Sequence, residues 1–127
     1  MEANRYYSVS FDERNYPSVK KLRRRCGGII AYGRWEALKQ LLFDADGRLA
    51  ADDPDIVGLI IDELEFGSRE EYDRFIQACI DFGLIDSAMF REAGSIISPE
   101  VAETLEYRRK QAEFGKKGGR PKKNSPR

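Results

Sequence analysis

Apolar residues recur every three or four positions along most of the chain, which is the spacing of amphipathic helices. Each of these stretches is bounded by residues typical of helix ends. The pattern therefore predicts a largely helical chain. The predicted helices cover residues 17–26, 29–45, 53–66, 68–82 and a last stretch that starts at 98–100.

The ends of these helices carry specific signals. Asp53 precedes a proline, which is typical of an N-cap followed by the first helical turn. Ser68 and Glu71 form a capping box, in which the serine hydroxyl accepts a hydrogen bond from the amide three residues on and the glutamate reaches back. Gly27 and Gly28 separate the first two helices, because glycine adopts the left-handed conformation at a helix end at low cost.

Short runs of aromatic and β-branched or aliphatic residues predict strands between and before the helices. They are residues 6–11, Leu84-Ile85 and Ile96-Ile97. Between the last two, Asp86 is placed to cap a helical turn at residues 88–90, and Gly94 is placed to end it.

This order of elements predicts a mainly α fold with a small β component. A helix–turn–helix followed by a pair of strands is the winged-helix arrangement. The helix that begins at Asp53 takes the supporting position, and the helix at Ser68–Phe82 takes the recognition position. Residues 84–86 and 96–98 are then the wing strands.

One domain accounts for most of the 127 residues. The winged-helix-like domain, with its C-terminal helix, is predicted to cover residues 1–114. Residues 115–127 contain no apolar residue able to anchor a core and are predicted to be a disordered basic tail. The apolar runs are too short for a membrane-spanning helix, and the N-terminus lacks the pattern of a signal peptide. We therefore expect a cytoplasmic protein with no membrane partner.

The residue types exclude much chemistry. The chain has no histidine and two cysteines, Cys26 and Cys79. Ser-His-Asp and Cys-His catalytic groups and histidine-containing zinc sites are therefore impossible, and no glycine-rich phosphate loop is present. Both cysteines lie in apolar helical patterns and are expected to be reduced core residues. We expect no enzyme activity, no metal site and no cofactor.

The net charge of zero conceals an uneven distribution of charge. Residues 1–40 carry nine Lys and Arg against four Asp and Glu, net +5. Residues 41–104 carry four against sixteen, net −12, and residues 105–127 carry nine against two, net +7. The basic ends are suited to a polyanionic partner, whereas the acidic middle repels one.

The order of several short motifs resembles that of a known family, the uncharacterised winged-helix-like N-terminal domain of phage replisome-organiser and DnaD-like replication initiation proteins. The matching motifs are the Tyr-Tyr-Ser near Tyr6, residues 17–28, 31–35 and 79–86, the helix start at 97–99, and residues 115–124. The resemblance implies a phage or prophage origin, a cytoplasmic setting and a role in the initiation of DNA replication. It implies a biological context and no particular mechanism.

Twelve cations are the candidate DNA contacts. Five of them cover the polar surface of the first helix, where DNA phosphates would compensate their mutual repulsion. The alternative is that they pair with the acidic middle of the domain or form a solvated face, since the dipole at a helix C-terminus favours cations. The full set is Lys20, Lys21, Arg23, Arg24, Arg25, Arg108, Arg109, Lys116, Lys117, Arg120, Lys122 and Lys123.

The tail allows three interpretations. Gly119-Arg120-Pro121 between lysines resembles half of an AT-hook, in which Gly-Arg-Pro lies in a narrow minor groove. The usual hook has a second arginine where this chain has Gly118. A general phosphate-binding tail and a solubilising linker are the other two interpretations.

Three further groups have simpler structural explanations. The solvent face of the helix at residues 68–82 is net acidic, so we do not expect it to read bases in the major groove. The carboxylates near Asp53 and Asp62 are explained by a cap and a solvated helix face rather than by magnesium binding. Trp35 lies on an apolar stripe beside Tyr32 and Arg34 and is expected to pack in the core rather than to stack on a base.

Two functions remain. The leading hypothesis is a non-catalytic winged-helix domain that binds DNA mainly through phosphate electrostatics, with little reading of sequence. The alternative is a protein–protein interaction module of a replication complex, in which the acidic middle docks a basic partner such as a helicase, a helicase loader or a second copy of the chain.

Overall fold

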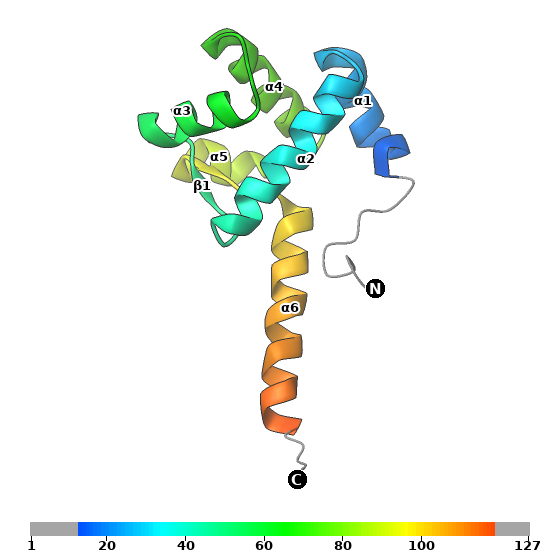
Figure 1. The fold of residues 1–127 in the computed structure, drawn as a ribbon, viewed down its shortest axis with the longest axis vertical. Helices are drawn as coiled ribbons and strands as arrows, with labels where there is room; N and C mark the ends of the chain where they lie inside the picture. The colour runs from blue at the N-terminus through cyan, green and yellow to red at the C-terminus, as the bar shows by residue number, and fades with distance from the viewer. Residues whose placement is uncertain (1–12, 119–127) are drawn as a thin grey trace.

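The structure is a computed structural model that describes residues 13–118, so the predicted strand at residues 6–11 lies outside it. In this range the chain is mainly helical, with one small antiparallel sheet (Figure 1). This confirms the predicted mainly α class. The elements are η2 (Glu13–Asn15), α1 (Pro17–Cys26), α2 (Ile29–Asp44), β1 (Leu49–Ala50), α3 (Pro54–Glu63), α4 (Arg69–Asp81), α5 (Ser87–Ala93), β2 (Ser95–Ile96) and α6 (Pro99–Gly118).

Helix α2 lies at the centre of the core (Figure 1). Trp35 on this helix is fully buried, which confirms that it packs in the core. Leu38 and Leu42 follow it on the same stripe, since residues three and four apart share a helix face. Buried apolar side chains of four other helices complete the core: Val19, Leu22, Ile60, Phe75, Cys79 and Val101.

The predicted caps and the glycine that ends α1 are confirmed, whereas α3 ends at Glu63 rather than at the predicted residue 66. Gly27 follows α1 in the left-handed conformation, with φ 105°. The side chain of Asp53 accepts a hydrogen bond from the Asp55 amide at 2.9 Å at the start of α3. Asp86 accepts one from the Met89 amide at 3.0 Å, so the predicted helical turn is the helix α5.

The capping box of α4 forms with one difference from the prediction. Ser68 Oγ accepts a hydrogen bond from the Glu71 amide at 3.1 Å, as expected. Glu71 Oε1 accepts in return from the amide of Gly67 at 2.6 Å, one residue before the amide that a capping box uses. The carboxylate therefore also holds the turn that leads into α4.

The strand β2 pairs with a different segment from the predicted one, residues 84–86. β1 pairs with β2 in antiparallel register, with Leu49 opposite Ile96 and Ala50 opposite Ser95. The Ala51 amide donates to the Gly94 carbonyl at 2.7 Å and continues the contact. The second predicted wing strand is thus present at β2, but it pairs with a segment between α2 and α3.

The predicted strand at residues 84–85 is wrong. The amides of Leu84 and Ile85 both donate to the carbonyl of Cys79, at 2.8 and 3.2 Å, and close the end of α4. These donors are therefore unavailable to a ladder. Only the next residue reaches the neighbouring segment, where the Asp86 amide donates to the Ile97 carbonyl at 2.8 Å.

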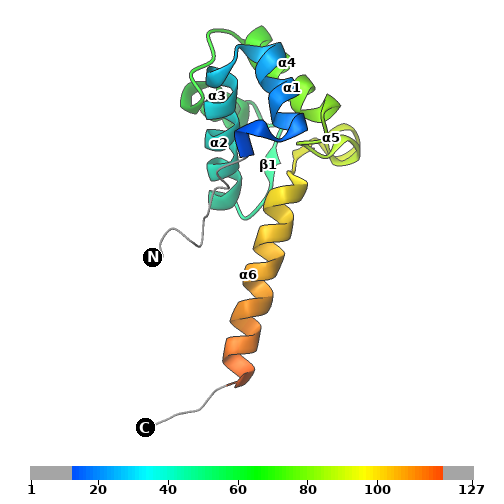
Figure 2. The same cartoon turned by 90° about the vertical axis from the view of Figure 1, so that its right-hand side faces the viewer.

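Helix α6 projects from the domain (Figures 1 and 2). Val101 is buried, Leu105 and Arg108 are half-buried, and residues 109–115 are all exposed. The helix continues to Gly118 and so includes the first four residues of the segment predicted to be a disordered tail, in keeping with the good helix formers that precede it. Residues 119–127 lie outside the described range. No helix within the described range is long and apolar enough to cross a membrane.

Candidate nucleic-acid interface

The outer side of α1 is basic. Lys20, Lys21 and Arg24 are exposed, whereas Val19 and Leu22 on the opposite side are buried. With 3.6 residues per turn, positions 20, 21 and 24 share one side of the helix. We call these three residues the α1 basic face. Their side chains make no ion pair or hydrogen bond to the part of the chain that the structure describes.

A shallow depression of about 330 Å³ adjoins the α1 basic face. Lys20, Arg23 and Arg24 line it, together with Gly28 at the turn into α2. Two of the three cations thus belong to the basic face, and Arg23 is half-buried beside them. An anionic oxygen placed here is within reach of several positive groups, as in a phosphate contact.

Arg25, the fifth predicted cation of the first helix, is engaged inside the protein. Its Nη1 lies 2.7 Å from Asp81 Oδ2 at the end of α4, and its guanidinium lies 4.5 Å from the centre of the Phe82 ring. The interpretation of internal pairing is therefore confirmed for Arg25, and the DNA interpretation stays a prediction for this helix. Arg25 connects α1 to α4, and the α1 basic face remains available.

The cations of α6 form a separate group. Arg109 is ion-paired with Glu106, and the Arg108 guanidinium lies 5.0 Å from the centre of the Phe43 ring. Lys116 and Lys117 lie at the far end of the helix, and their side chains are not described. Arg120, Lys122 and Lys123 lie outside the described residues. Figures 1 and 2 place the end of α6 far from α1, so the two basic groups do not form one continuous stripe.

The exposed face of α4 is acidic, as its sequence indicates. Arg69 lies 3.0 Å from Asp73, which uses one of the two arginines on this face in an intrahelical pair. Gln77 donates to Asp81 at 2.8 Å. A recognition helix that enters the major groove presents free donors to base edges, and little of this surface does so.

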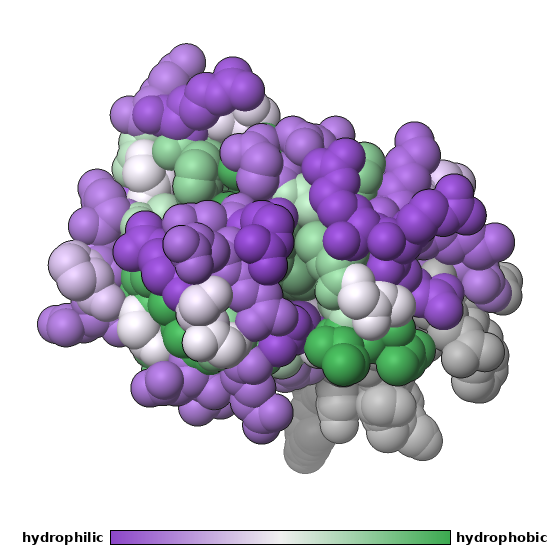
Figure 3. All heavy atoms as spheres, turned by 90° about the horizontal axis from the view of Figure 1, so that it is seen from above, coloured by the Kyte–Doolittle hydropathy of each residue, from purple (hydrophilic) through white to green (hydrophobic). Residues whose placement is uncertain are grey.

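An exposed apolar pair borders the α1–α2 turn. Ile29 and Ile30 at the start of α2 are 58% and 57% exposed. Seen from above, the molecule is mostly hydrophilic and carries a small apolar patch (Figure 3).

Arg34 holds the turn between α3 and α4, a role the sequence did not reveal. Its Nε donates to the Leu64 carbonyl at 2.8 Å, and its Nη2 donates to the Glu65 carbonyl at 2.7 Å. Its Nη1 lies 3.0 Å from Glu71, and the guanidinium stacks 4.4 Å from the centre of the Phe66 ring. One arginine of α2 therefore connects the turn after α3 to the first turn of α4.

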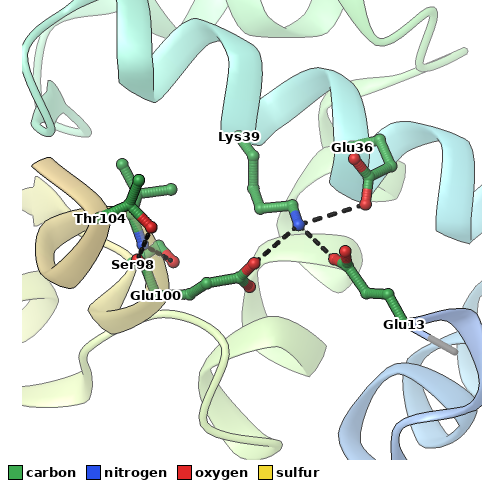
Figure 4. A network of polar contacts seen from close by, with 7 residues as sticks. Glu13, Glu36, Lys39, Ser98, Glu100 and Thr104 are labelled. Atoms are coloured by element: carbon green, nitrogen blue, oxygen red, sulfur yellow. Dashed lines mark hydrogen bonds and ion pairs between the residues drawn. The ribbon is translucent and has the colours of Figure 1, made fainter. Parts of the chain in front are cut away.

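A buried cation of α2 connects the segment before α1 to the start of α6. Lys39 on α2 is almost fully buried, and its ammonium contacts three carboxylates (Figure 4). It lies 3.2 Å from Glu36 Oε2 and 3.1 Å from Glu100 Oε2, and it is also paired with Glu13. Because Glu13 precedes α1 and Glu100 begins α6, this cluster fixes both basic segments to α2.

The cluster perturbs the protonation of its members. Burial opposes the charge of Lys39, but the three carboxylates outweigh it and raise the pKa of that ammonium. For Glu13, burial is the main effect, and together with Glu36 and Glu100 it raises the pKa to about 7 against the lowering effect of Lys39. Three carboxylates compete for one ammonium, so one of them takes up a proton readily.

This pKa predicts a pH dependence of stability. The ordinary pKa is 4.5 and the folded value about 7, so between these pH values the folded state binds more protons than the unfolded state. The free energy of unfolding therefore falls as pH rises through this window, by about 3 kcal/mol in total for this group. Urea denaturation of the wild type and of Glu13→Gln at pH 5 to 8 measures it.

The difference between the two proteins isolates the Glu13 effect. The carboxylates of Glu71 and Asp81 have lowered pKa values and titrate at lower pH in both proteins. Their contributions to stability therefore cancel in the difference between the two proteins. We expect the wild type to lose stability relative to Glu13→Gln as pH rises from 5 to 8. Parallel pH profiles for the two proteins would show that Glu13 titrates normally.

No group of three or more ligating side chains within residues 13–118 is arranged to hold a metal ion. In the cluster around Lys39, an ammonium occupies the position between the carboxylates. Cys26 and Cys79 are both free thiols, and burial raises the pKa of each. Cys79 is buried in the core as predicted, whereas Cys26 is half-buried.

Comparison with known proteins does not assign the chain to a family: no protein-family model, no curated protein and no solved structure matches it.

Proposed function

We propose that the chain is a non-catalytic DNA-binding domain that holds the phosphate backbone through the α1 basic face. The observation behind this proposal is that Lys20, Lys21 and Arg24 are exposed on one side of a helix without a described carboxylate partner. Three adjacent cations repel one another, and phosphates relieve this repulsion and release counterions. Arg23 and the depression beside it extend the surface.

We also propose that the fold is a winged helix with a modified wing. Helices α3 and α4 form the helix–turn–helix, and the β1–β2 pair together with the Asp86–Ile97 hydrogen bond resembles the usual small sheet. The helix α5 then stands where an extended wing loop would be. A short helix at this position presents less extended backbone to DNA than a wing loop does. This agrees with a DNA contact made through α1 rather than through the wing.

The resemblance of the motif order to phage replisome organisers supplies the biological setting of this proposal: initiation of phage or prophage DNA replication in the cytoplasm. The α1 motif at residues 17–28 carries both the resemblance and the basic face. Binding through phosphates gives affinity with little sequence preference, so sequence selection would come from another part of the replication complex.

One observation favours the second function, a protein–protein interaction module. Leu59 on α3 is 43% exposed, and Asp55, Asp62 and Glu63 lie on the same side of this helix. An apolar residue within an acidic surface is suited to a basic partner protein such as a helicase or loader. This surface is distinct from the α1 basic face, so the two functions are separable by experiment.

An NMR titration with a short DNA duplex tests the proposal. Amide resonances of the labelled full-length chain are followed as duplex is added at low salt. We expect the largest shifts at residues 20–28, and much smaller shifts on α3 and on the exposed side of α4. Shifts centred on α4, or no shifts at all, would contradict binding through α1.

A further inference from the structure

The projecting helix α6 carries an unpartnered aromatic stripe. Tyr107 and Phe114 are 63% and 74% exposed, the highest exposures among the large apolar side chains of the described residues. They are seven residues apart, so they lie on one side of the helix, almost two turns from each other. Val101 and Leu105, which pack on the domain, lie on a different side. The stripe therefore points away from the core of its own domain.

The stripe lies on a part of the helix that has little support from its own chain. Figures 1 and 2 both show α6 extending well beyond the domain. Residues 109–115 are all exposed. An unsupported helix of this length is only marginally stable in water, and packing of an apolar face is what usually stabilises it.

The charges of α6 are separated along its length. Its first eight residues contain three glutamates and no cation. The following residues contain five cations and one glutamate. Two such helices attract each other in antiparallel orientation, because the acidic half of each then faces the basic half of the other. In parallel orientation like charges face each other.

We propose that a second copy of this chain covers the stripe, through antiparallel pairing of the two α6 helices. A twofold axis between Lys110 and Gln111 places Tyr107 of each copy opposite Phe114 of the other. It also places Glu103 opposite the end of the second helix, next to Lys117. A twofold contact of this kind is self-complementary, as required for a symmetric dimer.

The contact is small, and the dimer is therefore weak. Four aromatic side chains supply most of its area, at roughly 150–250 Å² each when fully buried. This places the interface at the lower end of specific protein interfaces. We expect a dissociation constant of the order of tens of micromolar, so that dimers form at the high local concentration of chains gathered on one DNA.

Sedimentation of the full chain over about 5 to 500 μM tests the proposal. The wild type is expected to shift from monomer to dimer with concentration. The double variant Tyr107→Ala/Phe114→Ala is expected to dimerise at least tenfold more weakly, with unchanged circular dichroism because alanine favours helix. The matched control is Ile29→Ala/Ile30→Ala, which removes two similarly exposed side chains from α2 and leaves dimerisation unchanged.

Charge variants test the orientation. Glu103→Lys and Lys117→Glu each place like charges opposite one another in an antiparallel homodimer, so each weakens dimerisation. Mixing the two variants restores both opposite-charge contacts and is expected to restore the wild-type affinity. A parallel dimer already has like charges at these positions, so neither variant would weaken it.

Three results would overturn the proposal. The first is a wild type that remains monomeric at 500 μM. The second is a dimer that the aromatic double variant leaves intact or that the α2 control abolishes, since the contact then lies elsewhere. The third is a dimer that the charge variants do not weaken, since the orientation is then not antiparallel. None of these results bears on whether the α1 basic face binds DNA.

Discussion

Replacement of Lys39 by methionine is expected to lower the free energy of unfolding by about 3 kcal/mol. Methionine fills a similar space but leaves the carboxylates of Glu13, Glu36 and Glu100 without their shared cation. The loss of one partner of a buried ion pair is costly because the remaining charge stays desolvated. Part of this cost is relieved because Glu13 takes up a proton readily.

Urea denaturation at pH 7 measures this effect, with Lys21→Met as the matched control. Lys21 is exposed and is expected to change the free energy of unfolding by no more than about 0.5 kcal/mol. The double variant Lys39→Met/Glu13→Gln also removes one of the carboxylates that Lys39→Met leaves without a cation. It is expected to recover part of the lost free energy of unfolding, since the effects of substitutions within one network are not additive. Equal stability of Lys39→Met and the wild type would show that the cluster is energetically unimportant.

The second large effect is on DNA binding. Replacement of Lys20, Lys21 and Arg24 by alanine together is expected to lower the affinity for duplex DNA by about 100-fold or more at about 0.1 M salt, because three phosphate contacts are lost with their counterion release. Alanine is a good helix former, so α1 is expected to remain folded. Fluorescence anisotropy with a labelled duplex measures the affinity.

A triple variant elsewhere controls for net charge. Arg69, Arg74 and Arg91 are exposed cations outside α1, and their replacement by alanine changes the net charge by the same amount. We expect this variant to bind DNA within a few-fold of the wild type. Equal losses in the two triple variants would mean that the overall charge, and not the α1 basic face, governs binding.

Local signals in the sequence predicted the helices well. The caps at Asp53, Ser68 and Asp86 and the glycine after α1 act within three or four residues, so the sequence shows them directly. The strands were harder to predict. β1 has only two residues and no pattern of its own, and the donors of Leu84 and Ile85 are used by the end of α4.

The candidate site was predictable only in part, because several of its side chains pair with residues that are far away in the sequence. Counting charges along the chain identifies α1 as basic, but it does not show that Arg25 is paired with Asp81, 56 residues away. Arg34 likewise contacts residues 30 to 37 positions away, and Lys39 contacts Glu13 and Glu100, which are 26 and 61 positions away. One signal was available for Lys39: it lies four residues after Trp35 and three before Leu42, on the buried side of α2. A lysine at such a position needs buried partners.

The salt dependence of DNA binding tests the central claim, that the α1 basic face holds phosphates, most directly. The logarithm of the binding constant is measured against the logarithm of the salt concentration, for the wild type and for the α1 triple variant. We expect a steep fall for the wild type, and a slope for the variant that is shallower by about 3 because three cations no longer contact phosphates. Absence of binding at the lowest salt, or equal slopes for the two proteins, would contradict it.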